Sequence, residues 1–227
     1  MRIERVIIDP GHGGILDGVY QTAGKRFTFD GPPSWTLYEG DRQRVLAGFL
    51  ADELVARGVA VLSSLTGEDP HAEGADPWTP EDVPLSRRVA VANGLPRAMR
   101  AGCLFLSLHS NAISKSSEGP GQTRATGIVV FTSEGETGSD PVATAIHRDA
   151  AGVGHLRARS QAYEDGDPDY EAGFYVLRRT YCRAVLLELG FHDNPDDAAV
   201  LADDEALRDY AIAIAEAIAD FGAGAVS

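Results

Sequence analysis

The chain has 227 residues, of which 44% are hydrophobic, 24% charged and 7% aromatic, and its formal net charge is −14 at pH 7. This composition is typical of a globular protein and excludes a disordered chain, a collagen-like chain and a small disulfide scaffold, so we expect a single domain over residues 1–227. The 34 acidic against 20 basic residues argue against nucleic acid as a partner and against stable membrane association through a basic anchor.

The first residues of the chain do not have the pattern of an export signal. Met1–Arg5 is charged, and only Val6–Ile8 precede Asp9, whereas a signal peptide needs an apolar region of about 7–15 residues. No apolar run approaches the roughly 20 residues of a membrane-spanning helix. We therefore expect a chain that is made in the cytoplasm without a signal peptide. The free thiol of Cys103 opens an apolar run and is expected to be buried.

Short apolar runs alternate with helical patterns from one end of the chain to the other. Consecutive Val, Leu and Ile residues predict strands that are covered on both faces, at Arg5–Ile8, Val59–Leu62, Cys103–Leu108, Gly127–Thr132 and Arg183–Leu189. Apolar residues at helical spacing predict helices over Asp41–Arg57, Leu85–Asn93, Val142–Ala151 and Glu205–Phe221. This alternation predicts an α/β fold with a largely parallel sheet and helices on both faces.

Three predicted strands each lead into a polar residue with a reactive side chain. The first is followed by His12, the third by His109, and the last contains Glu188 within an apolar run. Because the carboxyl ends of parallel strands lie at one edge of the sheet, we expect these three side chains to converge there. A buried glutamate needs a partner or a function, since an unpaired buried charge costs several kcal/mol.

Two imidazoles and a carboxylate are ligand types of catalytic zinc sites. A further carboxylate is expected near the start of the first predicted helix, where Glu39 can point back toward the strand ends. Its structural alternative is an acid that the helix dipole favours, and Glu53 is a weaker candidate because it lies near the far end of the helix. The signatures of the common zinc proteases, zinc fingers and serine hydrolases are absent from the sequence.

Four segments occur in an order that is typical of a known family: Asp9–Gly14, Leu85–Asn93, Leu106–Ala112 and Leu187–Asp197. They resemble the motifs of the zinc-dependent N-acetylmuramoyl-L-alanine amidases, the type-3 amidase family, and the resemblance covers essentially the whole chain. It implies a six-stranded sheet between helices. It also implies cleavage of the amide bond between the lactyl group of muramic acid and the L-alanine of the stem peptide, with peptidoglycan as the substrate.

The same resemblance assigns roles to individual residues. It implies one zinc ion per chain on His12, Glu39 and His109, with Glu188 as the catalytic carboxylate. Two features depart from the family pattern: the segment Ile15–Tyr38 is expanded, and the basic residue that usually follows the glutamate is replaced by Gly40.

Further residues near these motifs receive supporting roles. Asp9 is expected to orient His12, because ligating histidines usually have such a partner. Asn111 and His192 are candidates for the rim of the site, and Arg88 and Asn93 are interpreted as structural. The remaining histidines, His71, His147 and His155, are expected on solvent-exposed faces.

Three long segments, Ile15–Tyr38, Thr66–Pro84 and Ser114–Ala125, are predicted to be loops, and the first and last are candidates for walls that grip glycan or peptide. Two alternative functions stay open. One is another zinc hydrolase on this scaffold, such as a stem-peptide endopeptidase, and the other is a non-catalytic wall-binding relative. The expected biological role is that of a phage lysin acting on the cell wall after release through the membrane, and the alternative is the excised catalytic domain of a secreted protein.

Overall fold

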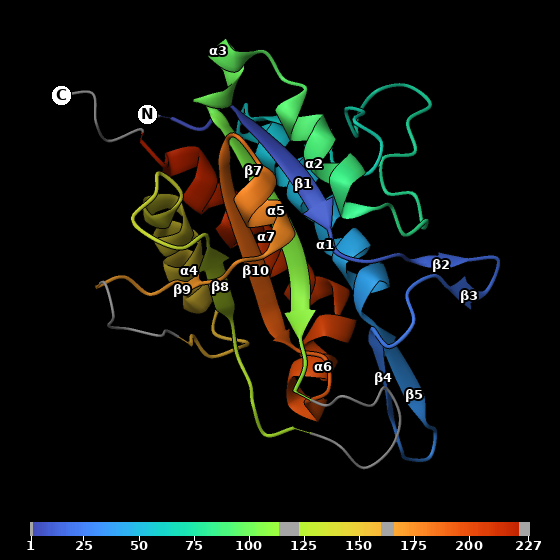
Figure 1. The fold of residues 1–227 in the computed structure, drawn as a ribbon. Helices are drawn as coiled ribbons and strands as arrows, with labels where there is room; N and C mark the ends of the chain where they lie inside the picture. The colour runs from blue at the N-terminus through green and yellow to red at the C-terminus, as the bar shows by residue number, and fades with distance from the viewer. Residues whose placement is uncertain (1, 114–122, 160–165, 223–227) are drawn as a thin grey trace.

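A six-stranded sheet in the order β6-β1-β7-β10-β8-β9 forms the centre of the computed structural model, which describes residues 2–113, 123–159 and 166–222 (Figure 1). The strands are β1 (Arg5–Pro10), β6 (Ala60–Ser63), β7 (Cys103–Asn111), β8 (Val129–Thr132), β9 (Tyr170–Glu171) and β10 (Arg183–Phe191). The four strands β6, β1, β7 and β10 are mutually parallel, and β8 runs antiparallel to β10. The predicted largely parallel sheet is confirmed.

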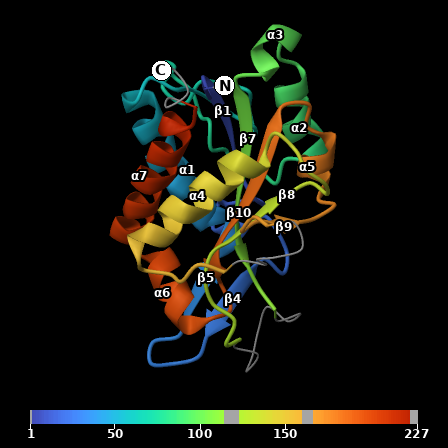
Figure 2. The same ribbon diagram turned by 90° about the vertical axis from the view of Figure 1, so that its left-hand side faces the viewer.

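Helices cover both faces of this sheet (Figure 2). One face carries α1 (Glu39–Ala56), α4 (Asp140–Val153) and α7 (Asp204–Asp220), and the other carries α2 (Leu85–Asn93) and α5 (Tyr175–Arg179). Two shorter helices, α3 (Arg97–Arg100) and α6 (Pro195–Ala202), lie at opposite ends of the sheet (Figure 1). The layer arrangement is the predicted one.

Consecutive strand residues belong to different hydrophobic cores. Val6 and Ile8 of β1 pack in the core under α1, α4 and α7, whereas Ile7 packs in the smaller core under α2 and α5. Leu104 and Phe105 of β7 divide in the same way. Because each face is covered, consecutive positions in the middle of these strands are apolar, which explains the continuous apolar runs in the sequence.

The prediction of a loop over Ile15–Tyr38 is wrong, because this segment forms two β-hairpins. They consist of β2 (Ile15–Leu16) with β3 (Val19–Tyr20) and of β4 (Arg26–Phe29) with β5 (Trp35–Tyr38). In the second hairpin Phe27, Phe29 and Leu37 are buried on one side. This alternation of buried and open positions is the signal for a strand with one covered face.

The other two predicted loops have different outcomes. Thr66–Pro84 contains no helix or strand, as predicted. Residues 114–122 of the predicted loop Ser114–Ala125 lie outside the described residues, so its role as a wall stays a prediction. Within the described ranges, no helix combines the length and the apolar character that a membrane span requires.

Candidate metal centre

The side chains of His12, Glu39 and His109 meet at the carboxyl edge of the sheet. Their ligand atoms all lie within 4.8 Å of one another. Glu39 Oε1 is 3.3 Å from His12 Nε2 and 3.0 Å from His109 Nδ1. The two imidazole rings are nearly perpendicular, with centroids 4.8 Å apart. The structure thus brings together three side chains that are far apart in the sequence.

Strand register and one glycine place His109 beside the other groups. His109 of β7 is directly opposite Glu188 of β10, so both side chains lie at the same level of the sheet. A Cβ atom on Gly11 would overlap the His109 ring. Only glycine permits the chain after β1 to approach the imidazole this closely.

Glu39 occupies the first position of α1, which begins two residues before the predicted start. The helix dipole and the backbone N–H of Ser110, 3.2 Å from Oε1, both favour its carboxylate. The next residue, Gly40, has no room for a side chain, because a Cβ atom there would overlap the carbonyl oxygen of Gly13. The close packing of the chain after β1 against α1 therefore explains the glycine at position 40.

His12, Glu39 and His109 shift one another's pKa values. Burial raises the pKa of Glu39, but its contacts with His109 and His12 outweigh burial and hold that pKa well below the usual range. Burial lowers the pKa of His109, yet the Glu39 carboxylate outweighs it and the net shift is upward. For His12 burial prevails and its pKa is lowered. His12 is thus a neutral imidazole at pH 7, the form that binds metals.

Some buried polar atoms of this group have no hydrogen-bond partner among the described residues. His12 Nε2 and Glu39 Oε2 are buried without a hydrogen bond from any described residue. Such atoms are rare in folded proteins, since leaving one unsatisfied costs about 1–3 kcal/mol. A cation between them would satisfy both, and two histidines with one carboxylate are a donor set of catalytic zinc sites. The residues therefore fit a zinc ion.

Glu188 lies beside this group, within the apolar strand β10. Its Oε2 atom is also buried without a hydrogen-bond partner among the described residues. Burial raises the pKa of Glu188 to about 7, a shift that His109 opposes and Glu39 reinforces. A carboxyl group that titrates near neutral pH is suited to accept and return a proton.

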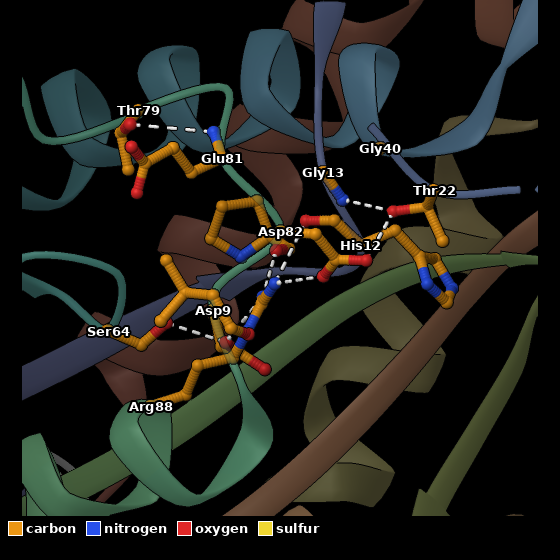
Figure 3. Close-up of polar contacts among 12 residues, drawn as sticks. Asp9, His12, Gly13, Thr22, Gly40, Ser64, Thr79, Glu81, Asp82 and Arg88 are labelled. Carbon is orange, nitrogen blue, oxygen red and sulfur yellow. Dashed lines mark hydrogen bonds and ion pairs between the residues drawn. The ribbon is translucent and has the colours of Figure 1, made fainter. Parts of the chain in front are cut away.

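Asp9 contacts different groups from the predicted one. Its Oδ1 accepts hydrogen bonds from Ser64 Oγ (2.5 Å) and Arg88 Nη1 (3.1 Å), and its Oδ2 accepts one from Ser107 Oγ (2.7 Å). No described hydrogen bond joins Asp9 to the His12 ring. Arg88 contacts both Asp9 and the His12 carbonyl oxygen, and the role of Asp9 in orienting His12 stays a prediction. Figure 3 shows Asp9 directed at Ser64 and Arg88.

Two buried arginines hold the backbone of His12 instead. Arg88 donates to the carbonyl oxygens of Pro10 (2.5 Å) and His12 (2.9 Å), and Arg44 also donates to the His12 carbonyl oxygen (3.0 Å). His12 has a φ of 61°, a conformation that few residues other than glycine adopt. The next peptide is fixed as well, because Gly13 N donates to Thr22 Oγ1 (2.7 Å, Figure 3). No sequence pattern indicated this contact of Arg44.

The predicted rim residues differ in position. Asn111 is half-buried at the end of β7, and its rim role stays a prediction. His192 is buried, with Nδ1 3.1 Å from Ser110 Oγ and 3.7 Å from Glu39 Oε2. It lies close to Glu39, and its rim role also stays a prediction.

The remaining predictions for single residues have mixed outcomes. His71 and His155 are exposed as predicted, but His147 is buried with Nε2 2.7 Å from the Arg159 carbonyl oxygen, because α4 packs against the segment after it. Asn93 is structural, since its side chain bonds the backbone of Arg179 and Tyr181. The weaker metal candidate, Glu53, forms an ion pair with Arg57.

A cavity of about 360 Å³ opens beside the two histidines. Its walls come from the chain after β1, the end of the loop before α2 and α2 itself, and they comprise Gly11, His12, Asp82, Val83, Pro84, Leu85, Arg88 and His109. A substrate can therefore reach the metal-ligand group from this side.

Comparisons with known proteins point to one family. A family model described as N-acetylmuramoyl-L-alanine amidase matches residues 6–220. A search among curated proteins gives no match.

Solved structures share the fold. The chain is similar to the N-acetylmuramoyl-L-alanine amidase from Clostridium difficile 630, with 23% identity, a TM-score of 0.71 and 99% of each chain covered. The catalytic domain of CwlV, an N-acetylmuramoyl-L-alanine amidase from Bacillus (Paenibacillus) polymyxa var. colistinus, has 22% identity and a TM-score of 0.67, covering 97% of this chain and 98% of that one. The catalytic domain of the CD27L endolysin, which targets Clostridia difficile, has 19% identity and a TM-score of 0.60, covering 95% and 96%.

Proposed function

The chain belongs to the N-acetylmuramoyl-L-alanine amidase family, and we propose that it is a zinc-dependent enzyme that hydrolyses the amide bond between muramic acid and L-alanine in peptidoglycan. The observation that carries the zinc dependence is the buried group of His12, Glu39 and His109 with its unpartnered ligand atoms. A buried cluster that leaves donor atoms unsatisfied is arranged for a ligand rather than for the stability of the free protein.

His12, Glu39 and His109 hold the metal ion in this proposal, one ion per chain. When bound, zinc supplies Lewis-acid chemistry, polarising the scissile carbonyl group and making water acidic enough to attack near neutral pH. Glu188 stands outside the group whose ligand atoms lie within 4.8 Å. This separation supports its assignment to proton transfer rather than to metal binding.

Glu188 moves the proton during hydrolysis. Its Oε2 accepts a proton from the attacking water and delivers it to the amine of the departing L-alanine. Burial raises the pKa of this carboxyl group to about 7 although His109 opposes the shift, and a pKa near neutrality suits both transfers. The neighbouring residues of β10 hold the carboxylate opposite His109, so the acid and the histidine keep a fixed separation.

Digestion of purified peptidoglycan by the zinc-loaded protein, followed by mass analysis of the fragments, tests the reaction. We expect free lactyl carboxylates on muramic acid and free amino groups on L-alanine. New amino groups inside the stem peptide, with the lactyl amide intact, would identify the endopeptidase alternative. An unchanged digest from a protein that holds zinc would identify a non-catalytic wall-binding protein.

The proposed biological role is lysis of the bacterial cell wall, as in a phage lysin. The presence of an endolysin catalytic domain among the structures with this fold makes the role compatible with the scaffold. Expression in the bacterial cytoplasm tests it: turbidity should fall only after the membrane is permeabilised, and the Glu188→Gln variant should leave it unchanged. Export to the wall without permeabilisation would instead support a secreted amidase.

A further inference from the structure

A second group of functional side chains lies beside β8, outside the metal-ligand group. A cavity of about 460 Å³ there is lined by Arg124, Thr126, Arg157, Arg159 and Tyr170. We call this the arginine cavity. Three guanidinium groups around one cavity are unexpected in a chain with a net charge of −14.

The topology of the sheet brings this cavity to the edge where Glu188 lies. Strand β8 is antiparallel to β10, and Val129 is opposite Glu188. The residues just before β8 therefore continue past the carboxyl end of β10 (Figure 1). Ile128 forms a bridge with Ala158 and bonds the backbones of Arg157 and Arg159 on either side. Both arginines are thus fixed next to the start of β8.

A buried carboxylate ties the cavity to the end of β10. Asp197 accepts hydrogen bonds from Thr126 Oγ1 (2.5 Å), Gly127 N (2.8 Å) and Phe191 N (2.8 Å). The guanidinium of Arg159 stacks on the Phe191 ring, 5.2 Å from its centroid. These contacts give the cavity a rigid wall that begins three residues after Glu188.

Two arginines of the cavity, Arg124 and Arg157, have no charged partner among the described residues. Arg124 and Arg157 are exposed, and within the described residues neither side chain has a hydrogen bond or an ion pair. The described residues that line the cavity include no carboxylate, and Asp197, which bonds Thr126 of the lining, accepts hydrogen bonds from three donors. Guanidinium groups without a protein carboxylate are suited to carboxylate recognition, because their planar N–H groups match the two oxygens.

We propose that the arginine cavity binds a free carboxylate of the stem peptide, and so holds the peptide side of the scissile bond. This inference rests on the proposed amidase function. The glycan presents mainly neutral hydroxyl and acetamido groups, whereas stem peptides carry carboxylates, so the peptide is the part of the substrate that three arginines select. The cavity places that peptide along β8, on the side of Glu188 away from β7.

The test compares two soluble muramyl peptides that differ only in whether the carboxylates of the peptide are free or amidated. We expect Arg157→Gln and Arg124→Gln each to lower kcat/KM for the free-acid peptide about tenfold, through KM, and to leave the amidated peptide unaffected. Arg97→Gln is the matched control, because it removes the same charge from exposed α3 at the opposite end of the sheet (Figure 1). An equal loss on both peptides, or the same loss in Arg97→Gln, would overturn the proposal.

Calorimetry of the full chain separates this proposal from the proposed function. The free-acid muramyl peptide should bind more tightly than the amidated one, and Arg157→Gln should abolish the difference even if neither peptide is hydrolysed. A preparation that hydrolyses both peptides but binds them equally would leave the amidase assignment intact and reject the arginine cavity. Inorganic phosphate serves as the second probe: tight, Arg157-dependent phosphate binding without discrimination between the peptides would assign the cavity to wall phosphodiesters and overturn the stem-peptide assignment.

Discussion

Two buried polar regions meet at His12, and they differ in whether the protein satisfies them. Around Asp9, both carboxylate oxygens have donors, from Ser64, Ser107 and Arg88. Around Glu39, one carboxylate oxygen and the neighbouring His12 nitrogen have none among the described residues. The Asp9 and Glu39 side chains are both almost fully inaccessible to solvent, so burial alone does not distinguish the two carboxylates.

Because of this difference, the backbone of His12 has a structural role and its side chain has a chemical one. The carbonyl oxygen of His12 belongs to the satisfied region, since Arg44 and Arg88 donate to it. Its imidazole belongs to the unsatisfied region with Glu39 and His109. A closed network of hydrogen bonds fixes the backbone, which lets the open group of ligand atoms stay in place before a metal binds.

Removal of a metal ligand from the unsatisfied region around Glu39 should have the largest effect. His12→Ala, Glu39→Gln or His109→Ala should reduce zinc from about one ion per chain to none and abolish hydrolysis together with it, because a catalytic site with three protein ligands loses a third of its donors. Metal analysis after dialysis measures the first effect and peptidoglycan digestion the second. His155→Ala is the control, since that histidine is exposed and pairs with Asp209. Full zinc occupancy in any of the three variants would remove that residue from the ligand set.

Glu188→Gln should lower turnover by a factor of about 10² to 10⁴ while zinc content and melting temperature stay close to those of the wild type. Glutamine is nearly isosteric and neutral, so the variant removes the proton acceptor without opening a cavity. Turnover is measured on peptidoglycan with zinc in excess. Activity above about a tenth of the wild-type value is incompatible with the assigned role. Loss of zinc in this variant would instead place Glu188 among the ligands.

In the satisfied region around Asp9, removal of one hydrogen-bond partner should mainly lower the stability of the fold. Arg88→Met leaves the buried Asp9 carboxylate without its charged partner and removes a donor from three backbone carbonyl groups, those of Val83, Pro10 and His12. Breaking a buried pair in this way costs about 3–5 kcal/mol, which denaturant unfolding of the zinc-free protein measures. The control is Arg57→Met, which breaks a partly exposed pair with Glu53 and should cost at most about 1 kcal/mol.

A second measurement on Arg88 separates positioning from stability alone. Under conditions where the variant is folded, its zinc affinity should be lower than that of the wild type, because the strained backbone of His12 is less firmly held. Arg88→Lys keeps the charge but not the paired donors, so it should restore part of the stability and less of the affinity. Unchanged zinc affinity in both variants would limit Arg88 to a structural role.

The contrast between these regions also explains what the sequence could reveal. His12, His109 and Glu188 were predictable because each interrupts or follows an apolar strand, and parallel strands end at one edge. The partners of Asp9 and the role of Arg44 were not, since their contacts join residues from different elements: Arg44 bonds a carbonyl group 32 positions away, and Arg88 bonds Asp9 79 positions away. A one-sequence pattern contains no sign of which distant donor reaches which acceptor.

The same distinction between local patterns and distant contacts explains which helices and strands could be predicted. Strands and helices buried on wide surfaces were predicted, since their apolar periodicity is local. The hairpins within Ile15–Tyr38 were missed because their turn residues dominate the segment, although Phe27 and Phe29 alternate with open positions. The arginine cavity was not predicted at all, because Arg124 and Arg157 come together only through the bridge of Ile128 to Ala158.

Two further carboxylates, Asp167 and Asp169, show that an unsatisfied buried atom is not by itself a sign of function. Asp167 Oδ1 and Asp169 Oδ1 are buried without partners among the described residues, but no described histidine or third acid completes a metal-ligand group with them. Burial, reinforced by Asp167, raises the pKa of Asp169 from 3.8 to about 7, against the opposing hydrogen bond from Thr132. Here two acids in contact account for the unsatisfied atoms, so we expect strain that protonation relieves.

The upward shift of the Asp169 pKa leads to the prediction with the smallest expected effect. Because the pKa of Asp169 is higher in the folded than in the unfolded chain, its stabilising contribution is complete below the unfolded value of 3.8 and is lost as pH rises through about 7. The zinc-free protein should therefore lose about 2–3 kcal/mol of unfolding free energy between about pH 5 and pH 8 from this group. Asp169→Asn should remove that loss, and added zinc should leave it unchanged, because zinc acts on the metal-ligand group alone. Denaturant unfolding across this pH range measures both effects. An identical pH slope in Asp169→Asn would show that Asp169 ionises normally, and a slope that zinc abolishes would make these acids part of a metal site.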